Sequence, residues 1–134
     1  MVTEMVVKES LSEQMISAGS ELIRRLDEAG LPVSGALWFY DPESNYWRLI
    51  IASPEVRNQG LKAIYKAVQS VVEAVPEDQS IISLKDISVV DSSDQLISLL
   101  KVAVKTDKGI SSIRFSRNMI NGTLVEDTYI YRLT

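Results

Sequence analysis

Two apolar segments of this chain are each interrupted by a short run of turn-forming residues, and this pattern limits the possible folds most strongly. Residues 33–52 are aromatic and aliphatic on both sides of Asp41-Pro42-Glu43-Ser44-Asn45. Residues 110–133 show the same arrangement around Asn121-Gly122, a pair favoured in two-residue type I′ turns. Aromatic and β-branched runs on either side of turn formers are typical of β-hairpins. We therefore expect two antiparallel hairpins.

Three other segments have the periodicity of amphipathic helices. Apolar residues recur every three or four positions in residues 10–30, 61–75 and 94–103. Ser10 and Glu13 have the spacing of a capping box, and Gly30 and Pro76 are conventional helix ends. Residues 81–90 predict a further buried strand, interrupted near Lys85-Asp86 where the alternation slips.

The resulting order α-β-β-α-β-α-β-β predicts an α+β fold. We expect a mostly antiparallel sheet of about five strands, with helices mainly on one face. The chain has 134 residues, of which 46% are hydrophobic and 24% charged, an ordinary balance for one globular domain. It shows no internal repeat and no dividing linker, so we expect a single domain over residues 1–134.

The composition excludes several kinds of catalytic and metal site. The chain contains no cysteine and no histidine. Disulfides, zinc–thiolate sites, Ser/His/Asp triads and histidine-based metal sites are therefore ruled out. No Walker-type loop, G-x-G-x-x-G or nucleophile elbow is present either.

The same composition suggests where the protein works. The absence of cysteine fits a reducing compartment, and no apolar run approaches the 18 or more residues of a membrane span. The N-terminus lacks the pattern of a secretion signal. We expect a soluble, cytoplasmic protein that does not bind membranes. Its net charge of −4 argues against a dedicated duplex-DNA binder.

Carboxylates provide the one plausible catalytic alternative, a magnesium-dependent phosphoryl-transfer or nuclease-type enzyme. The candidate ligands are two clusters, Asp86, Asp91 and Asp94 in one and Glu126 with Asp127 in the other. Each has a structural explanation as well. Asp91 and Asp94 sit where a helix start favours negative charge, and the second cluster faces basic residues across a hairpin. We therefore expect no enzyme activity, no cofactor and no metal site.

The hairpin registers predict which side chains share a face. Pairing Tyr40 with Tyr46 places an apolar set on the core face of the first hairpin, namely Leu37, Phe39, Trp47, Leu49 and Ile51. Pairing Ile120 with Thr123 sets Arg117 opposite Glu126 and Arg114 opposite Tyr129. The core face of the second hairpin then carries Ile113, Phe115, Met119, Leu124 and Ile130.

The opposite faces of both hairpins combine into a predicted binding surface rich in aromatic residues and arginine. Its members are Trp38, Tyr40, Tyr46, Arg48, Arg114, Tyr129 and Tyr131. Tryptophan, tyrosine and arginine are enriched at binding hot spots, so we expect a non-catalytic interaction module whose partner is a second copy, in a homodimer, or a foreign protein. Single-stranded nucleic acid or a nucleotide is an alternative ligand, because aromatic rings stack on bases. The same residues also suit an exposed sheet that binds nothing, or a face covered by a helix such as the first.

Overall fold

The computed structural model describes residues 8–134 and confirms the α+β class, with one five-stranded sheet. The strands lie in the order β3-β2-β1-β5-β4. Their bounds are β1 (Gly35–Asp41), β2 (Tyr46–Ser53), β3 (Ile87–Asp91), β4 (Ile113–Ile120) and β5 (Thr123–Leu133). Only β2 and β3 are parallel, and every other neighbouring pair is antiparallel. Both predicted hairpins are therefore present, joined through β1 and β5.

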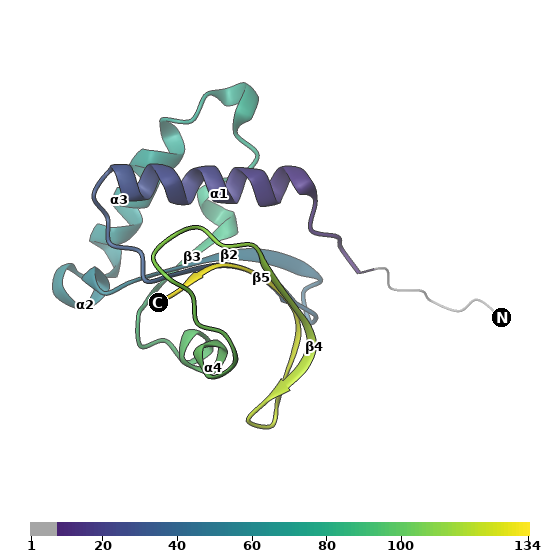
Figure 1. Cartoon of the computed structure of the whole chain (residues 1–134). Coiled ribbons are helices and arrows are strands. Elements are labelled where there is room, and N and C mark those ends of the chain that lie inside the picture. Colours follow the sequence, from purple (N-terminus) through teal and green to yellow (C-terminus); the bar gives the residue numbers. More distant parts are fainter. Residues whose placement is uncertain (1–7) are drawn as a thin grey trace.

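Helices cover both faces of this sheet, as Figure 1 shows. The helices α1 (Glu13–Glu28), α2 (Glu55–Gln59) and α3 (Leu61–Glu73) lie on one side, and α4 (Gln95–Ala103) lies on the other. Most helices thus share one face, as the sequence predicts. Each side has its own hydrophobic core, with Leu26, Trp38 and Ile64 in the first and Leu37, Ile97 and Ile130 in the second. None of the helices within residues 8–134 is long and apolar enough to cross a bilayer.

Some helices and strands begin at other residues than predicted, and local hydrogen bonds explain two of these differences. The first helix begins after Ser12 rather than Ser10, because the Ser12 hydroxyl accepts the Met15 N–H at 3.1 Å. The strand predicted for residues 81–90 is confined to β3, because residues 84–86 form a 3-10 turn that Ser83 and Asp86 cap reciprocally. A second 3-10 turn (Glu77–Gln79) follows α3, and the short helix α2 is not among the three helices that the periodicity predicts.

The predicted register of the first hairpin is wrong by one residue. Tyr40 pairs with Trp47, and Tyr46 pairs with Asp41. The closing pair of the hairpin is therefore Asp41–Tyr46, one position later on the first strand than we expected. Because a one-residue slip turns one strand over relative to the other, Trp47 joins the face of Tyr40, and Arg48 joins the face of Phe39.

The register of the second hairpin is confirmed, but its apolar faces are only partly as predicted. Ile120 pairs with Thr123, and Arg114 pairs with Tyr129. Met119 and Leu124, expected in the core, are 65% and 56% exposed. Arg117 has a φ of +48° and interrupts the side-chain alternation, so Ile120 turns inward in place of its neighbour.

Candidate functional site

Five of the seven predicted binding residues lie on the same face of the sheet. Arg114 pairs with Tyr129, and Tyr129 pairs in turn with Trp38 on β1. Tyr40 and Tyr131 belong to the same hydrophobic core as Trp38. The sequence therefore grouped these residues correctly, although the slip in the first hairpin removes Tyr46 and Arg48 from the group.

The centre of this aromatic face is covered in the structure. Trp38 and Tyr131 are each 1% exposed, because α1 packs directly on them. The Tyr131 hydroxyl accepts a hydrogen bond from Trp38 Nε1 at 3.0 Å and donates one to the Ile16 carbonyl of α1 at 2.6 Å. Burial raises the pKa of Tyr131. The alternative that the first helix covers this face is confirmed.

Gly19 makes this close approach of helix and sheet possible. A Cβ at position 19 would lie 2.9 Å from Trp38 Nε1 and closer still to the Tyr131 hydroxyl. Real Cβ atoms almost never approach other atoms so closely. The helix can therefore contact the two aromatic side chains only because residue 19 has no side chain.

Tyr46 and Arg48 lie on the opposite face of the sheet and join β2 to its neighbours. The Tyr46 hydroxyl donates a hydrogen bond to Asp86, which raises the pKa of Tyr46. Arg48 Nε donates to the Ser88 hydroxyl at 2.7 Å, and its Nη2 donates to the Ile87 carbonyl at 3.2 Å. Both side chains hold β3 and the turn before it against β2.

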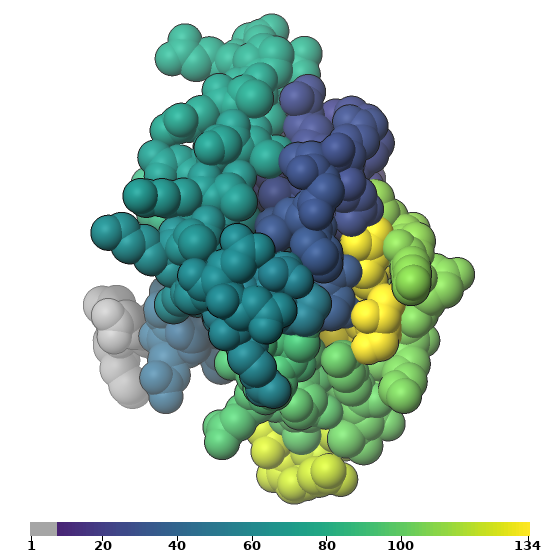
Figure 2. All heavy atoms as spheres, turned by 90° about the vertical axis from the view of Figure 1, so that its left-hand side faces the viewer, coloured from purple at the N-terminus to yellow at the C-terminus, as the bar shows by residue number. Residues whose placement is uncertain are grey.

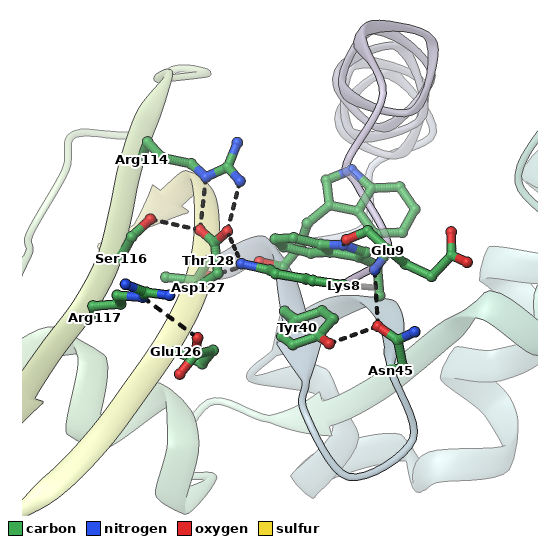
Figure 3. A network of polar contacts seen from close by, with 12 residues as sticks. Lys8, Glu9, Tyr40, Asn45, Arg114, Ser116, Arg117, Glu126, Asp127 and Thr128 are labelled. Carbon is green, nitrogen blue, oxygen red and sulfur yellow. Dashed lines mark hydrogen bonds and ion pairs between the residues drawn. The ribbon is translucent and has the colours of Figure 1, made fainter. Parts of the chain in front are cut away.

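A buried carboxylate, Asp127, accepts hydrogen bonds from three side chains beside the aromatic face (Figure 3). Arg114 donates to both carboxylate oxygens at 2.7 Å, Ser116 donates to Oδ1 at 2.7 Å, and Lys8 Nζ donates to Oδ2 at 2.6 Å. Burial alone would raise the pKa of Asp127, but the hydrogen bonds from Arg114, Lys8 and Ser116 outweigh it and hold the pKa far below its usual range. Asp127 is thus a fixed negative charge and not a proton donor.

Two aromatic rings complete a cage around the Lys8 ammonium group. Its Nζ lies 4.7 Å from the centroid of the Tyr40 ring and 5.7 Å from that of Trp47. These distances are in the range of cation–π attraction. We call Tyr40, Trp47 and Asp127 together the ammonium cage. The next residue is held as well, since Trp47 Nε1 donates to the Glu9 carbonyl at 2.9 Å.

The other candidate carboxylates have structural partners. Asp94 caps α4 by accepting the Leu96 N–H at 3.0 Å, and Asp91 accepts from Ser93 and Arg57. Glu126 pairs with Arg117 at 3.7 Å, as the hairpin register predicts. The described residues contain no group of three or more acidic side chains placed to hold a metal ion.

Two grooves run along the outer side of α1, one on each flank. The groove towards α3, here the α3 groove, has a volume of about 400 Å³ and an apolar lining that includes Leu22, Val72 and Ile81. The groove towards the sheet, here the β groove, has about 530 Å³ and is lined by Ile110, Tyr129 and Tyr131 among others. Figure 2 shows α1 in purple and blue between the teal segment of α3 and the green and yellow residues that precede β4 and end β5.

The grooves share three properties that matter for binding. Ser17 and Glu21 of α1 line both, so they stand on the ridge between them. Each groove has an exposed isoleucine in its lining, Ile81 at 46% and Ile110 at 39%. All charged lining residues are acidic, with Glu21 in both grooves, Asp78 in one and Glu13 in the other. Arg24 and Arg25 pair with the Glu21 carboxylate, and the hydrogen bond from Arg24 lowers the pKa of Glu21 to about 2.

Sequence reasoning missed the residues that define these features. Trp47 belongs to the ammonium cage that Lys8 fills, but the predicted register had assigned Trp47 to the opposite face. Nothing in the sequence pattern links Lys8 to Asp127, which is 119 residues away. Ile81 lies in a segment predicted as a buried strand, and its exposure follows from the late start of β3.

Comparison of the chain with protein-family models, with curated protein sequences and with solved structures finds no match. The function must therefore be inferred from the geometry of the chain itself.

Proposed function

We propose that this chain is a non-catalytic protein-interaction module that binds a partner segment across α1. The observation that carries the proposal is the pair of grooves on either side of α1, each with an exposed isoleucine in its lining. Grooves of this size hold a few large side chains, and protein partners commonly anchor in such grooves. The absence of cysteine supports a cytoplasmic site of action.

The charge of the grooves indicates the chemistry of the partner. Arg24 and Arg25 offset the charge of Glu21, but each groove has one further acidic lining residue, Asp78 or Glu13, and the whole chain has a net charge of −4. A segment that carries apolar side chains flanked by lysine or arginine would therefore be complementary. A second copy that docked by the same face would place acidic residues against acidic residues, so a foreign protein is the better partner. An amphipathic helix suits the site, because helices commonly bind in apolar grooves by one face.

Nucleic acid is the weaker alternative. Trp38, Tyr40 and Tyr131, which would have stacked on bases, are at most 4% exposed. The acidic lining of the grooves would also repel phosphate groups. A magnesium enzyme likewise lacks a grouped set of ligands within residues 8–134.

A binding experiment with designed peptides tests the proposal. A fluorescein-labelled helical peptide with leucine on one face and lysine elsewhere should bind the wild-type chain with a Kd in the micromolar range, measured by fluorescence anisotropy. The same peptide with glutamate in place of lysine should bind at least tenfold more weakly. Ile81→Asp and Ile110→Asp should each weaken binding of the lysine peptide about tenfold or more, because each replaces the exposed apolar side chain of its groove by a charge.

Met119→Asp is the matched control, since Met119 is an apolar residue that is 65% exposed and lies at the tip of the β4–β5 hairpin, outside both grooves. This variant should bind as the wild type does. If it weakens binding as much as the groove variants, or if neither peptide binds, the proposed function is wrong. Circular dichroism of each variant establishes that the fold is retained.

A further inference from the structure

We infer that the ammonium cage is a binding site for a lysine side chain, which the chain fills with its own Lys8 and which a lysine of another polypeptide can occupy instead. The cage combines two aromatic rings with a carboxylate that is almost completely buried. Aromatic walls and a carboxylate are how proteins recognise ammonium groups. The inference is separate from the grooves along α1 and does not depend on them.

The walls of the cage are held in place without Lys8. The Tyr40 hydroxyl donates to Asn45 Oδ1 at 2.6 Å, and the Tyr40 and Trp47 rings contact each other with centroids 5.3 Å apart. Asp127 is fixed by Arg114, which donates to both carboxylate oxygens, and by Ser116, which donates to Oδ1. A preformed site loses little entropy when it takes a ligand, so the cage should remain able to bind when Lys8 leaves.

Lys8 itself is attached in a way that allows exchange. Its side chain is 41% exposed, and it precedes α1 in a segment without regular secondary structure. Two hydrogen bonds hold the next residue, from Glu9 N to Asn45 Oδ1 at 2.8 Å and from Trp47 Nε1 to the Glu9 carbonyl. Lys8 therefore acts as a tethered ligand, present at the high effective concentration of an intramolecular contact.

Small ammonium compounds test this site directly in the full chain. In a Lys8→Ala variant, n-butylammonium, which matches the lysine side chain, should shift the indole N–H resonance of Trp47 saturably in ¹⁵N NMR spectra. We expect a Kd on the order of 1–10 mM, as suits one charge-assisted hydrogen bond and two cation–π contacts. The wild type should bind at least tenfold more weakly, because Lys8 competes. The indole of Trp38 is an internal control, since it is bonded to Tyr131 in the core and should not shift.

One control ligand and two further variants test whether the binding depends on charge. Neutral 1-butanol should produce no saturable shift, and the double variant Lys8→Ala/Asp127→Asn should bind at least tenfold more weakly than Lys8→Ala. Lys8→Gln, which keeps a long stem but loses the charge, replaces Lys8→Ala if that variant does not fold. The inference is overturned if the folded charge-free variant does not bind n-butylammonium. It is equally overturned if wild type and variant bind alike, or if 1-butanol binds as well as the ammonium does.

Discussion

Replacing Gly19 by alanine should destabilise this protein, although the same change in most helices stabilises them. Gly19 lies within α1, where alanine is favoured over glycine by about 1 kcal/mol. Here, however, the new methyl group would meet the Tyr131 hydroxyl and Trp38 Nε1, the latter at 2.9 Å. Neither atom can withdraw easily, because both side chains are about 1% exposed and bonded to each other.

The expected size of the effect follows from these opposing contributions. Overpacking a well-packed core costs about 1–3 kcal/mol, and disturbing the Trp38–Tyr131 and Tyr131–Ile16 hydrogen bonds costs about 1 kcal/mol. After the gain in helix propensity, we expect a net loss of about 2 kcal/mol. With an unfolding entropy of about 2.1 cal/mol/K per residue, this corresponds to a fall in Tm of roughly 7 °C for a chain of 134 residues.

Urea unfolding followed by circular dichroism measures this loss, and a double-mutant cycle with Tyr131→Phe identifies its cause. Tyr131→Phe removes the atom nearest to the new methyl group but leaves Trp38 Nε1, so Gly19→Ala should cost about 1 kcal/mol less in that background. Ser17→Ala, an exposed change on the same helix, should alter stability by no more than about 0.5 kcal/mol. The reasoning fails if Gly19→Ala is neutral or stabilising, or if its cost is the same with and without the Tyr131 hydroxyl.

Two further predictions concern single carboxylates. Asp127→Asn should lower stability at pH 7 by about 2 kcal/mol, because it weakens charge-assisted hydrogen bonds to a buried acceptor. The pKa of Asp127 is lower in the folded state than the value near 4 of an unfolded chain, so its contribution is full above about pH 5 and declines as the pH falls. Urea unfolding from pH 6 to pH 3 should therefore show a shallower loss in the variant, and equal slopes would contradict this account. Asp94→Ala should cost about 1 kcal/mol by removing the cap of α4, and Asp94→Asn should restore most of it in thermal melts, since both residues cap helices well.

The sequence predicted those parts of the fold that depend on local patterns. Both hairpins, the three main helices and the mostly antiparallel sheet follow from periodicity and turn chemistry. The register of the second hairpin was also predictable, because Asn121-Gly122 specifies a two-residue turn. The first hairpin has a longer turn without such a signature, and consecutive aromatic residues on both strands gave an aromatic side chain to each face in either register.

Features that depend on distant parts of the chain were not predictable in this way. The parallel pairing of β3 with β2 is long-range and has no local signal. The contact between Lys8 and Asp127 joins the start of the chain to its last strand. The φ of Arg117, which exposes Met119, arises within a strand and has no glycine to mark it.

The aromatic face shows why residue type alone does not separate a binding surface from a core. Tryptophan and tyrosine suit binding hot spots because they combine a large apolar area with a polar group, and the same property suits a core that contains partners for those groups. Here the Trp38 N–H donates to the Tyr131 hydroxyl, which in turn donates to the Ile16 carbonyl of α1. Burial therefore leaves neither polar group unpaired. The sequence does contain one indication of this outcome. Gly19 lies four residues from both Met15 and Ile23, on the buried side of α1. A glycine in that position marks a close approach of another element. An aromatic strand face together with a glycine on the buried side of a helix therefore favours a packed core, and a binding site is better sought on the outer side of that helix.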